Sequence, residues 1–472
     1  MDPTLAAKWY GISTVQPAGV AILICCVILT LVVRRNWAIF PLVILLMAIP
    51  SAQRFIVADL DLTFIRLVVL TGFLRVFIRR EYTDFTFQLP DKVIILWAIW
   101  AIIAYTMLRD GFSGLITRTG YMFEVVGCYF LARIYLKDMF DLRRLIGLLG
   151  IASIPMVGVF LFERFNGRNI FAEFGGVPER TLIRNGRLRC QGPFTHPIMA
   201  GVFWANVVPW LGAMWFTKAI PRTALAVYII CILGIIMNTA SSTPVMALIF
   251  AVIGFSFYYL RRYMSYARWG LVALVLSLHM IMDKPVWHLI ARMNVVGGST
   301  GWHRYHLMDK AVANFWEWWA IGTESTAHWG MGLEDVTNQY VLEGVRAGIL
   351  GLGLYVFLLG SIFWILGKAM RGANSKTELI ILWASGTMLF ANVAGFFAVS
   401  YFGQTEVAFF LFLGTSVSLA TTAIETRRAK IREHLKSEDT PAAAPSPERG
   451  VVLNTEPLSR ARPDGPRLNN HR

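Results

Sequence analysis

The sequence contains little cysteine and few charged residues. Only 5 of its 472 residues are cysteine, and four of these lie in apolar runs, where cysteine behaves as a small hydrophobic side chain. Their spacing matches neither a disulfide framework nor a zinc site. Charged residues make up 15% of the chain, against 56% hydrophobic residues. This composition excludes a disulfide-stapled secreted domain and is typical of a chain embedded in lipid.

Long apolar runs recur along the whole chain. Each approaches the twenty residues that cross about 30 Å of hydrocarbon as a helix, whereas a β-barrel would show short alternating segments. The sequence therefore predicts an all-α polytopic membrane protein with about 12–13 transmembrane helices. No cleavage site of small residues follows the first run, so we expect it to be retained as a span. The predicted spans are 16–33, 37–50, 59–78, 91–108, 118–135, 142–162, 197–216, 221–238, 243–260, 268–282, 345–366, 377–398 and 402–424.

The charges of the connecting loops predict which side of the membrane each loop occupies. Lysine and arginine gather in cytoplasmic loops. One set of short loops holds 16 of these residues, whereas the opposite loops at 51–58, 239–242 and 399–401 hold one. We expect the N-terminus outside, and a disordered cytoplasmic tail at 425–472 after a membrane domain at 1–424. The basic loops are 34–36, 79–92, 137–144, 218–222, 261–268 and 368–376.

Two predicted outer segments are long, 163–196 and 283–344. The first contains six arginines and no lysine, although positive charge is usually scarce on this side. The planar guanidinium fork matches phosphate oxygens in pairs, so we predict a phosphate or pyrophosphate site near the lipid headgroups. The alternative is that the arginines pair with Glu163, Glu173 and Glu179, or with anionic lipid. The six are Arg164, Arg168, Arg180, Arg184, Arg187 and Arg189.

The second outer segment supplies candidate acid–base and sugar-stacking groups. Five of the eight histidines fall in the two outer segments, and histidine is a common general base near neutral pH. Tryptophans are frequent in 283–344; they could stack on sugar rings or form an interfacial belt. Residues 302–319 have the spacing of an amphipathic helix, which would direct Arg304 toward a lipid pyrophosphate.

Four motifs give the chain a resemblance to a known family. They are RLRCQGPFTHPIMAG, NTASSTPVMALIF, Arg304 followed by WGMGL, and TNQYVLEGVRAGILGLGLYV. Over roughly 120–425 the chain resembles the O-antigen ligase and O-antigen/exopolysaccharide polymerase superfamily of bacterial integral membrane glycosyltransferases. The family usually has Ser-Arg-Gly where this chain has Ser242-Thr243, and Glu where it has Arg346. Ligases also have His at the position of Thr337, so its loss favours a polymerase.

The resemblance implies a metal-independent, inverting glycosyl transfer in the bacterial inner membrane, with the active site facing the periplasm. The donor would be a glycan on undecaprenyl pyrophosphate, and the acceptor would be another glycan. The resemblance implies no cofactor. Chain-length regulators and export proteins are possible partners, whereas nucleic acid is not expected. A ligase that transfers the glycan to lipid A core remains the alternative within the family.

The motifs also nominate individual site residues. Arg184, Arg187, Arg189 and Arg304 are expected to hold the pyrophosphate, which stabilises negative charge on the leaving group. Asp335 is the candidate general base, with His328 as the second candidate. Sugar hydroxyls would bind at Asn338, Gln339 and Tyr340.

Charged residues inside predicted spans suggest one further class of function. Arg66, Glu124 and Glu406 are costly in a membrane, so they are either functional or paired between helices. Intramembrane charge is also typical of a transporter or a flippase of polysaccharide precursors. Transporters usually show repeated spans with charge at mid-membrane, whereas this chain has no internal repeat and concentrates its polar residues in outer loops.

Overall fold

A computed structural model describes residues 13–57, 60–109, 111–292 and 301–438. It is 73% helical and divides into two compact units, 1–427 and 428–472. The helices are α2 (Pro17–Val32), α3 (Phe40–Ala48), α4 (Phe64–Ile78), α5 (Leu89–Leu108), α6 (Phe112–Tyr135), α7 (Met139–Asn166), α8 (Pro197–Ala205), α9 (Val208–Thr217), α10 (Arg222–Asn238), α11 (Ser242–Ser256), α12 (Met264–Ile281), α13 (Gly301–Ala313), α14 (Phe315–Trp318), α15 (Gln339–Met370), α16 (Lys376–Gly395) and α17 (Gln404–Glu438).

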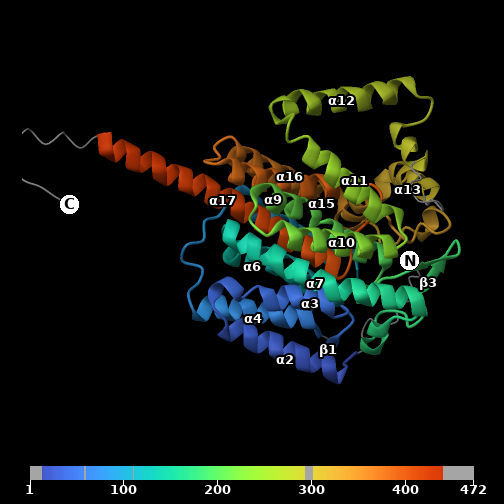
Figure 1. Ribbon diagram of the computed structural model, residues 1–472. Coiled ribbons are helices and arrows are strands. Elements are labelled where there is room, and N and C mark those ends of the chain that lie inside the picture. The colour runs from blue at the N-terminus through green and yellow to red at the C-terminus, as the bar shows by residue number, and fades with distance from the viewer. Residues whose placement is uncertain (1–12, 58–59, 110, 293–300, 439–472) are drawn as a thin grey trace, which may run out of the picture. The chain divides into compact units, whose positions relative to one another are not determined.

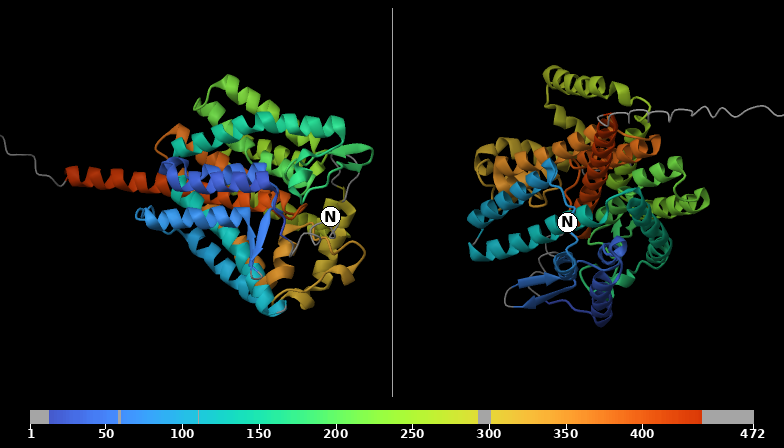
Figure 2. Two further views of the ribbon diagram at one scale, coloured as in Figure 1. Left: turned by 90° about the horizontal axis from the view of Figure 1, so that it is seen from below. Right: turned by 90° about the vertical axis from the view of Figure 1, so that its left-hand side faces the viewer.

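Each of the thirteen predicted spans overlaps a helix or, for 197–216, the consecutive helices α8 and α9. In the described part of the chain, seven helices are long and apolar enough to cross a membrane, which confirms a mostly helical membrane protein. Within the first unit α2, α3 and α4 pack against one another, and α5 packs along α15 (Figures 1 and 2). The apolar helix α12 stands apart from this bundle and buries none of its residues.

The prediction of a disordered tail from residue 425 is wrong for its first part. α17 continues without a break to Glu438. The reason is local, since Ala, Arg, Lys, Glu and Leu dominate residues 425–438 and all of them favour helix. Residues 439–472, which hold the rest of the predicted tail, lie outside the described residues.

The all-α prediction also missed two short antiparallel hairpins. β1 (Arg54–Val57) pairs with β2 (Leu60–Thr63), and β3 (Leu182–Arg184) pairs with β4 (Arg187–Arg189). β1, β3 and β4 lie in segments predicted as connections, whereas β2 replaces the start of the predicted span 59–78, whose helix α4 begins only at Phe64. Two short strands scarcely change the helical content, but β3 and β4 set the direction of the arginines in the first long outer segment.

Loops predicted to share the outer side of the membrane contact one another. The Gln404 side chain donates to the carbonyl oxygens of Ile49 (2.7 Å) and Pro193 (3.1 Å), which joins the outer ends of two predicted spans to the first long outer segment. Loops predicted to be cytoplasmic also meet each other. Lys137 lies 3.6 Å from Asp84, in a different basic loop. These contacts agree with the two sets of loops that the charges predict.

The late glycine motif interrupts α15 and anchors the second outer segment. Gly348 has φ +67°, and a Cβ there would lie 2.2 Å from the carbonyl oxygen of Ala320. The helix therefore breaks at Ala347 and Gly348, and the turn before residue 324 inserts at the break. The backbone N–H of Ile349 donates to the carbonyl of Trp319 at 2.8 Å, and that of Thr323 to Val345 at 2.8 Å.

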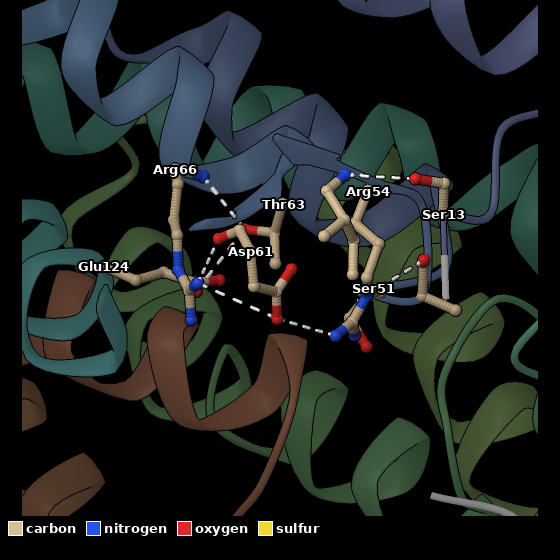
Figure 3. A network of polar contacts seen from close by, with 9 residues as sticks. Ser13, Ser51, Arg54, Asp61, Thr63, Arg66 and Glu124 are labelled. Atoms are coloured by element: carbon tan, nitrogen blue, oxygen red, sulfur yellow. Dashed lines mark hydrogen bonds and ion pairs between the residues drawn. The ribbon is translucent and has the colours of Figure 1, made fainter. Parts of the chain in front are cut away.

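Two of the three candidate charges within predicted spans form a pair between helices. Arg66 of α4 and Glu124 of α6 lie 3.2 Å apart, and their side chains are only 14% and 10% exposed. Figure 3 shows that Asp61 of β2 extends this pair into a network, with Arg54 of β1 at 2.7 Å from its carboxylate. The network ties the β1–β2 hairpin to two helices, as the pairing hypothesis expected. Glu406 accepts a hydrogen bond from the hydroxyl of Tyr121 in α6.

Candidate anion site at the arginine-rich hairpin

An Asn-Gly turn directs the arginines of the first outer segment. Asn185 (φ +51°) and Gly186 (φ +70°) both adopt the left-handed conformation that a two-residue hairpin turn requires. The register places Arg184 opposite Arg187, and Leu182 opposite Arg189. Directly opposite residues share a face, so all three arginines project from the same face of the hairpin. The sequence contains the turn signal in "RNGR", which would have predicted the hairpin.

A buried carboxylate fixes the base of the β3–β4 hairpin. Glu163, near the end of α7, is 1% exposed and accepts hydrogen bonds from both connections of the hairpin. The donors are the hydroxyl of Thr181 (3.2 Å) and the backbone N–H groups of Gln191 (3.2 Å) and Gly192 (2.9 Å). Glu163 therefore holds backbone rather than an arginine. The pairing alternative applies instead to Arg168, whose guanidinium lies 2.8 Å from Glu179 at the surface.

A cavity of about 180 Å³ lies where this hairpin meets α8, α13 and the segments before α15 and α17. About 10–15 Å³ is enough for one water, so the cavity admits a considerably larger group. Four of the predicted site residues line it: Arg184, Arg189, Arg304 and Asp335. The other lining residues are His196, Ile198, Met199, Thr337, Ala398, Val399, Ser400 and Phe402.

Arg189 and Arg304 reach the cavity from segments 115 positions apart in the sequence, and each is held by a hydroxyl group. The Nη2 of Arg189 donates to the Oγ of Ser241 at 2.7 Å, and that of Arg304 to the Oγ1 of Thr243 at 3.1 Å. In the described part of the chain no carboxylate lies within ion-pair distance of either guanidinium. The Nε of each is buried and has no hydrogen-bond partner among the same residues.

Burial and mutual repulsion act on these two arginines. Burial, and then the nearby positive charge of Arg184, lower the pKa of Arg189 and that of Arg304 to about 10. Both guanidinium groups therefore stay charged at neutral pH. Three arginines and one aspartate line the cavity, which leaves its wall positive and suited to an anion with several oxygens.

His196 is a cavity residue that the sequence did not nominate individually. It is the N-cap of α8, and its Nδ1 accepts a hydrogen bond from the backbone N–H of Ile198 at 3.1 Å. Burial, and then the charge of Arg189, lower the pKa of His196 to about 3. The imidazole is thus neutral with its proton on Nε2, so it offers a donor to an anion rather than a general base. The sequence signal for a helix that begins at His196 is the pattern "THP" before an apolar run, because proline favours the first position of a helix.

The two candidates for the general base occupy different surroundings. Asp335 lines the cavity together with the arginines. His328 does not line it, because its Nε2 lies 2.9 Å from the Oε2 of Glu317 at the surface. Glu317 also accepts a hydrogen bond from the indole N–H of Trp329 at 2.9 Å. The geometry therefore brings only Asp335 to the arginines.

Four of the nominated binding residues do not line the cavity. Arg187 is exposed on β4. Asn338 caps α15 by accepting from two backbone N–H groups, and the Gln339 amide donates to Glu343 at 2.9 Å. The hydroxyl of Tyr340 donates to the carbonyl of Val393 at 2.8 Å. The polar groups of the last three thus hold the protein's own helices together.

The helix predicted at 302–319 forms as α13 and α14, and it carries Arg304. Its apolar face packs on a small core around Leu307, Trp318 and Trp329, so two of the tryptophans are structural. In the described residues no group of three His, Cys, Asp or Glu side chains is placed to bind a metal ion. A scan against models of known protein families finds no match, and a search of curated proteins finds none either.

Proposed function

We propose that the protein is a glycosyltransferase that polymerises oligosaccharide repeat units carried on undecaprenyl pyrophosphate. The observation that carries this proposal is the convergence of Arg189 and Arg304 on one cavity, where, among the residues that the structure describes, their Nε donors have no partner and no carboxylate pairs with them. Such a site binds a group with several phosphate oxygens. The apolar helices on which the site is built favour a lipid-linked phosphate over a soluble one.

The cavity residues supply the two functions that the reaction needs. A hydroxyl of the acceptor glycan attacks the anomeric carbon of the donor sugar, and the bond from that carbon to the pyrophosphate oxygen breaks with its electron pair leaving on the oxygen. Fixed guanidinium groups from Arg189 and Arg304 stabilise this developing charge in a largely buried site. The Nε2–H of His196 adds a neutral donor. The acceptor proton passes to the carboxylate of Asp335.

The face of the membrane follows from the loop charges. Basic residues gather in one set of short loops, none of which lines the cavity, and we assign those loops to the cytoplasm. The cavity then opens to the periplasm of the inner membrane, where assembled lipid-linked glycans are displayed. A polar site at the outer surface fits transfer between glycans better than passage through the protein.

The test is an elongation assay with purified protein in detergent and undecaprenyl-pyrophosphoryl oligosaccharide. We expect lipid-linked products of several repeat lengths. Arg189→Ala and Arg304→Ala should each lower the rate by about 100-fold or more, which is typical for loss of one donor to a developing charge. Arg187→Ala is the matched control, because this exposed arginine of the same hairpin does not line the cavity, and it should elongate normally.

Three outcomes would contradict the proposal. Transfer only to lipid A core would make the protein a ligase. Movement of the lipid-linked glycan across vesicles without any elongation would make it a flippase. Equal activity in the Arg189, Arg304 and Arg187 variants would show that the cavity takes no part in the reaction.

A further inference from the structure

The turn between α10 and α11 contacts both cavity arginines. Ser241 is the N-cap residue of α11 and Thr243 lies in its first turn, and they are 7% and 3% exposed. Each accepts one hydrogen bond from a guanidinium, Ser241 from Arg189 and Thr243 from Arg304. The same turn also holds the hairpin by its backbone, because the N–H of Cys190 donates to the carbonyl of Asn238 at 3.0 Å.

A hydroxyl that holds a guanidinium reduces the cost of ordering it. A free arginine side chain has considerable rotamer entropy, part of which is lost when a ligand binds. Fixing the side chain beforehand removes part of this cost from the binding step. Each hydroxyl accepts from Nη2 and leaves the Nε–H available, so the arginine is oriented while donors remain for an anion.

The two hydroxyls also fix how far apart the two guanidinium groups lie. Ser241 and Thr243 are two residues apart at the start of a helix, where the backbone geometry allows little variation. Arg189 and Arg304 belong to otherwise separate segments, β4 and α13. Without this shared support, each arginine would be placed only by its own element.

We infer that Ser241 and Thr243 are positioning residues that space Arg189 and Arg304 to bind the two phosphoryl groups of one diphosphate. The inference rests on the proposed function and deepens it, because it assigns to two hydroxyl groups the spacing of the arginines by which the site would distinguish a diphosphate from a monophosphate. Neither hydroxyl needs to touch the substrate. The neighbouring Ser242 is partly exposed, and its side chain makes no hydrogen bond to the described residues, which makes it a matched control.

The experiment measures how strongly the full-length protein in lipid nanodiscs prefers pyrophosphate over orthophosphate, by calorimetric titration with each ion. We expect the wild type to prefer pyrophosphate. Ser241→Ala and Thr243→Ala should each weaken pyrophosphate binding about tenfold, the usual effect of losing one hydrogen bond that supports a charged group, and leave orthophosphate binding within about twofold. Ser242→Ala should behave as the wild type. Ser241→Thr and Thr243→Ser keep the hydroxyl and should restore the preference, which separates positioning from misfolding.

The outcomes distinguish the two proposals. If the wild type elongates glycans and prefers pyrophosphate, but the alanine variants keep that preference unchanged, the positioning role is refuted and the proposed function stands. If the wild type prefers pyrophosphate but elongates no glycan, the proposed function is wrong. The loss or retention of that preference in the Ser241→Ala and Thr243→Ala variants still decides whether the two hydroxyls position the arginines. If the wild type binds neither ion, the inference is wrong as well.

Discussion

The imidazole Nδ1 of His196 accepts a hydrogen bond from the backbone N–H of Ile198, 3.1 Å away. This contact caps α8 and at the same time fixes the ring's proton on Nε2. Together with a pKa lowered to about 3 by burial and by Arg189, it makes His196 a neutral donor in a cavity lined by arginines.

The low pKa of His196 gives a testable dependence of stability on pH. Below the ordinary histidine pKa of 6.5, His196 binds a proton in the unfolded chain but not in the native protein, because its native pKa is lower. Acidification therefore destabilises the native state. His196→Gln removes this effect, and glutamine can cap a helix as Gln16 caps α2. We expect the variant's midpoint of thermal unfolding to rise relative to the wild type as the pH falls from 7 to 5.

Tryptophan fluorescence in detergent measures the unfolding midpoints of the wild type and of His196→Gln. The difference between the two midpoints isolates the contribution of His196, because the other groups titrate equally in both proteins. A difference that does not change with pH would mean that His196 titrates normally in the native protein.

Asp335 and His328 should differ sharply in their effect on the reaction. General acid–base catalysis contributes about 10²–10⁴-fold, and only Asp335 lines the cavity. We expect Asp335→Asn to lower kcat by about this factor with little change in the KM for the lipid-linked donor. His328→Ala, which removes a surface partner of Glu317, should keep most of its activity. The elongation assay measures the activity of both variants. A large loss in His328→Ala together with a small loss in Asp335→Asn would identify His328 as the general base.

The Arg66–Glu124 pair should contribute to stability rather than to chemistry. Arg66→Met leaves the Glu124 carboxylate buried without its partner, which typically costs about 3–5 kcal/mol. The double variant Arg66→Met with Glu124→Leu removes both charges and should recover most of the loss. Unfolding in detergent measures stability, and elongation measures function. A stable double variant without activity would instead show that the pair serves the reaction.

Removing the carboxylate of Glu163 should release the base of the β3–β4 hairpin. Glu163→Ala leaves the backbone N–H groups of Gln191 and Gly192 without their acceptor, at a cost of about 1–3 kcal/mol for each buried donor. We expect faster proteolysis within 181–192 and weaker pyrophosphate binding. Glu179→Ala, which removes only a surface ion pair in the same segment, is the control and should change neither.

The sequence predicts the helices well because length and hydropathy decide them locally. All thirteen runs contain helix, and the arginine-rich segment and Arg304 do reach one cavity. The missed features depend on contacts between distant segments. Nothing local shows that Ser241 and Thr243 hold arginines 52 and 61 positions away.

Two other differences between the sequence-based predictions and the structure have simpler causes. The Asn-Gly turn of the hairpin is a local signal in the sequence, whereas the composition of the segment indicates only its charge. Asn338 and its two neighbours are polar residues near a site, but one caps a helix and the others bond to neighbouring segments. Polarity and position could not distinguish capping from binding, whereas the direction of each hydrogen bond does.

The most direct test is the side of the membrane on which the arginine hairpin lies. Asn185→Cys places a thiol at the exposed tip of the hairpin, in a Cys25→Ser background that removes the exposed native thiol. Thr83→Cys, in an exposed basic loop assigned to the cytoplasm, is the control. With a membrane-impermeant maleimide on intact spheroplasts, we expect Cys at 185 to be labelled and Cys at 83 to react only after permeabilisation. Labelling of position 185 only after permeabilisation would put the arginines in the cytoplasm and contradict a periplasmic diphosphate site.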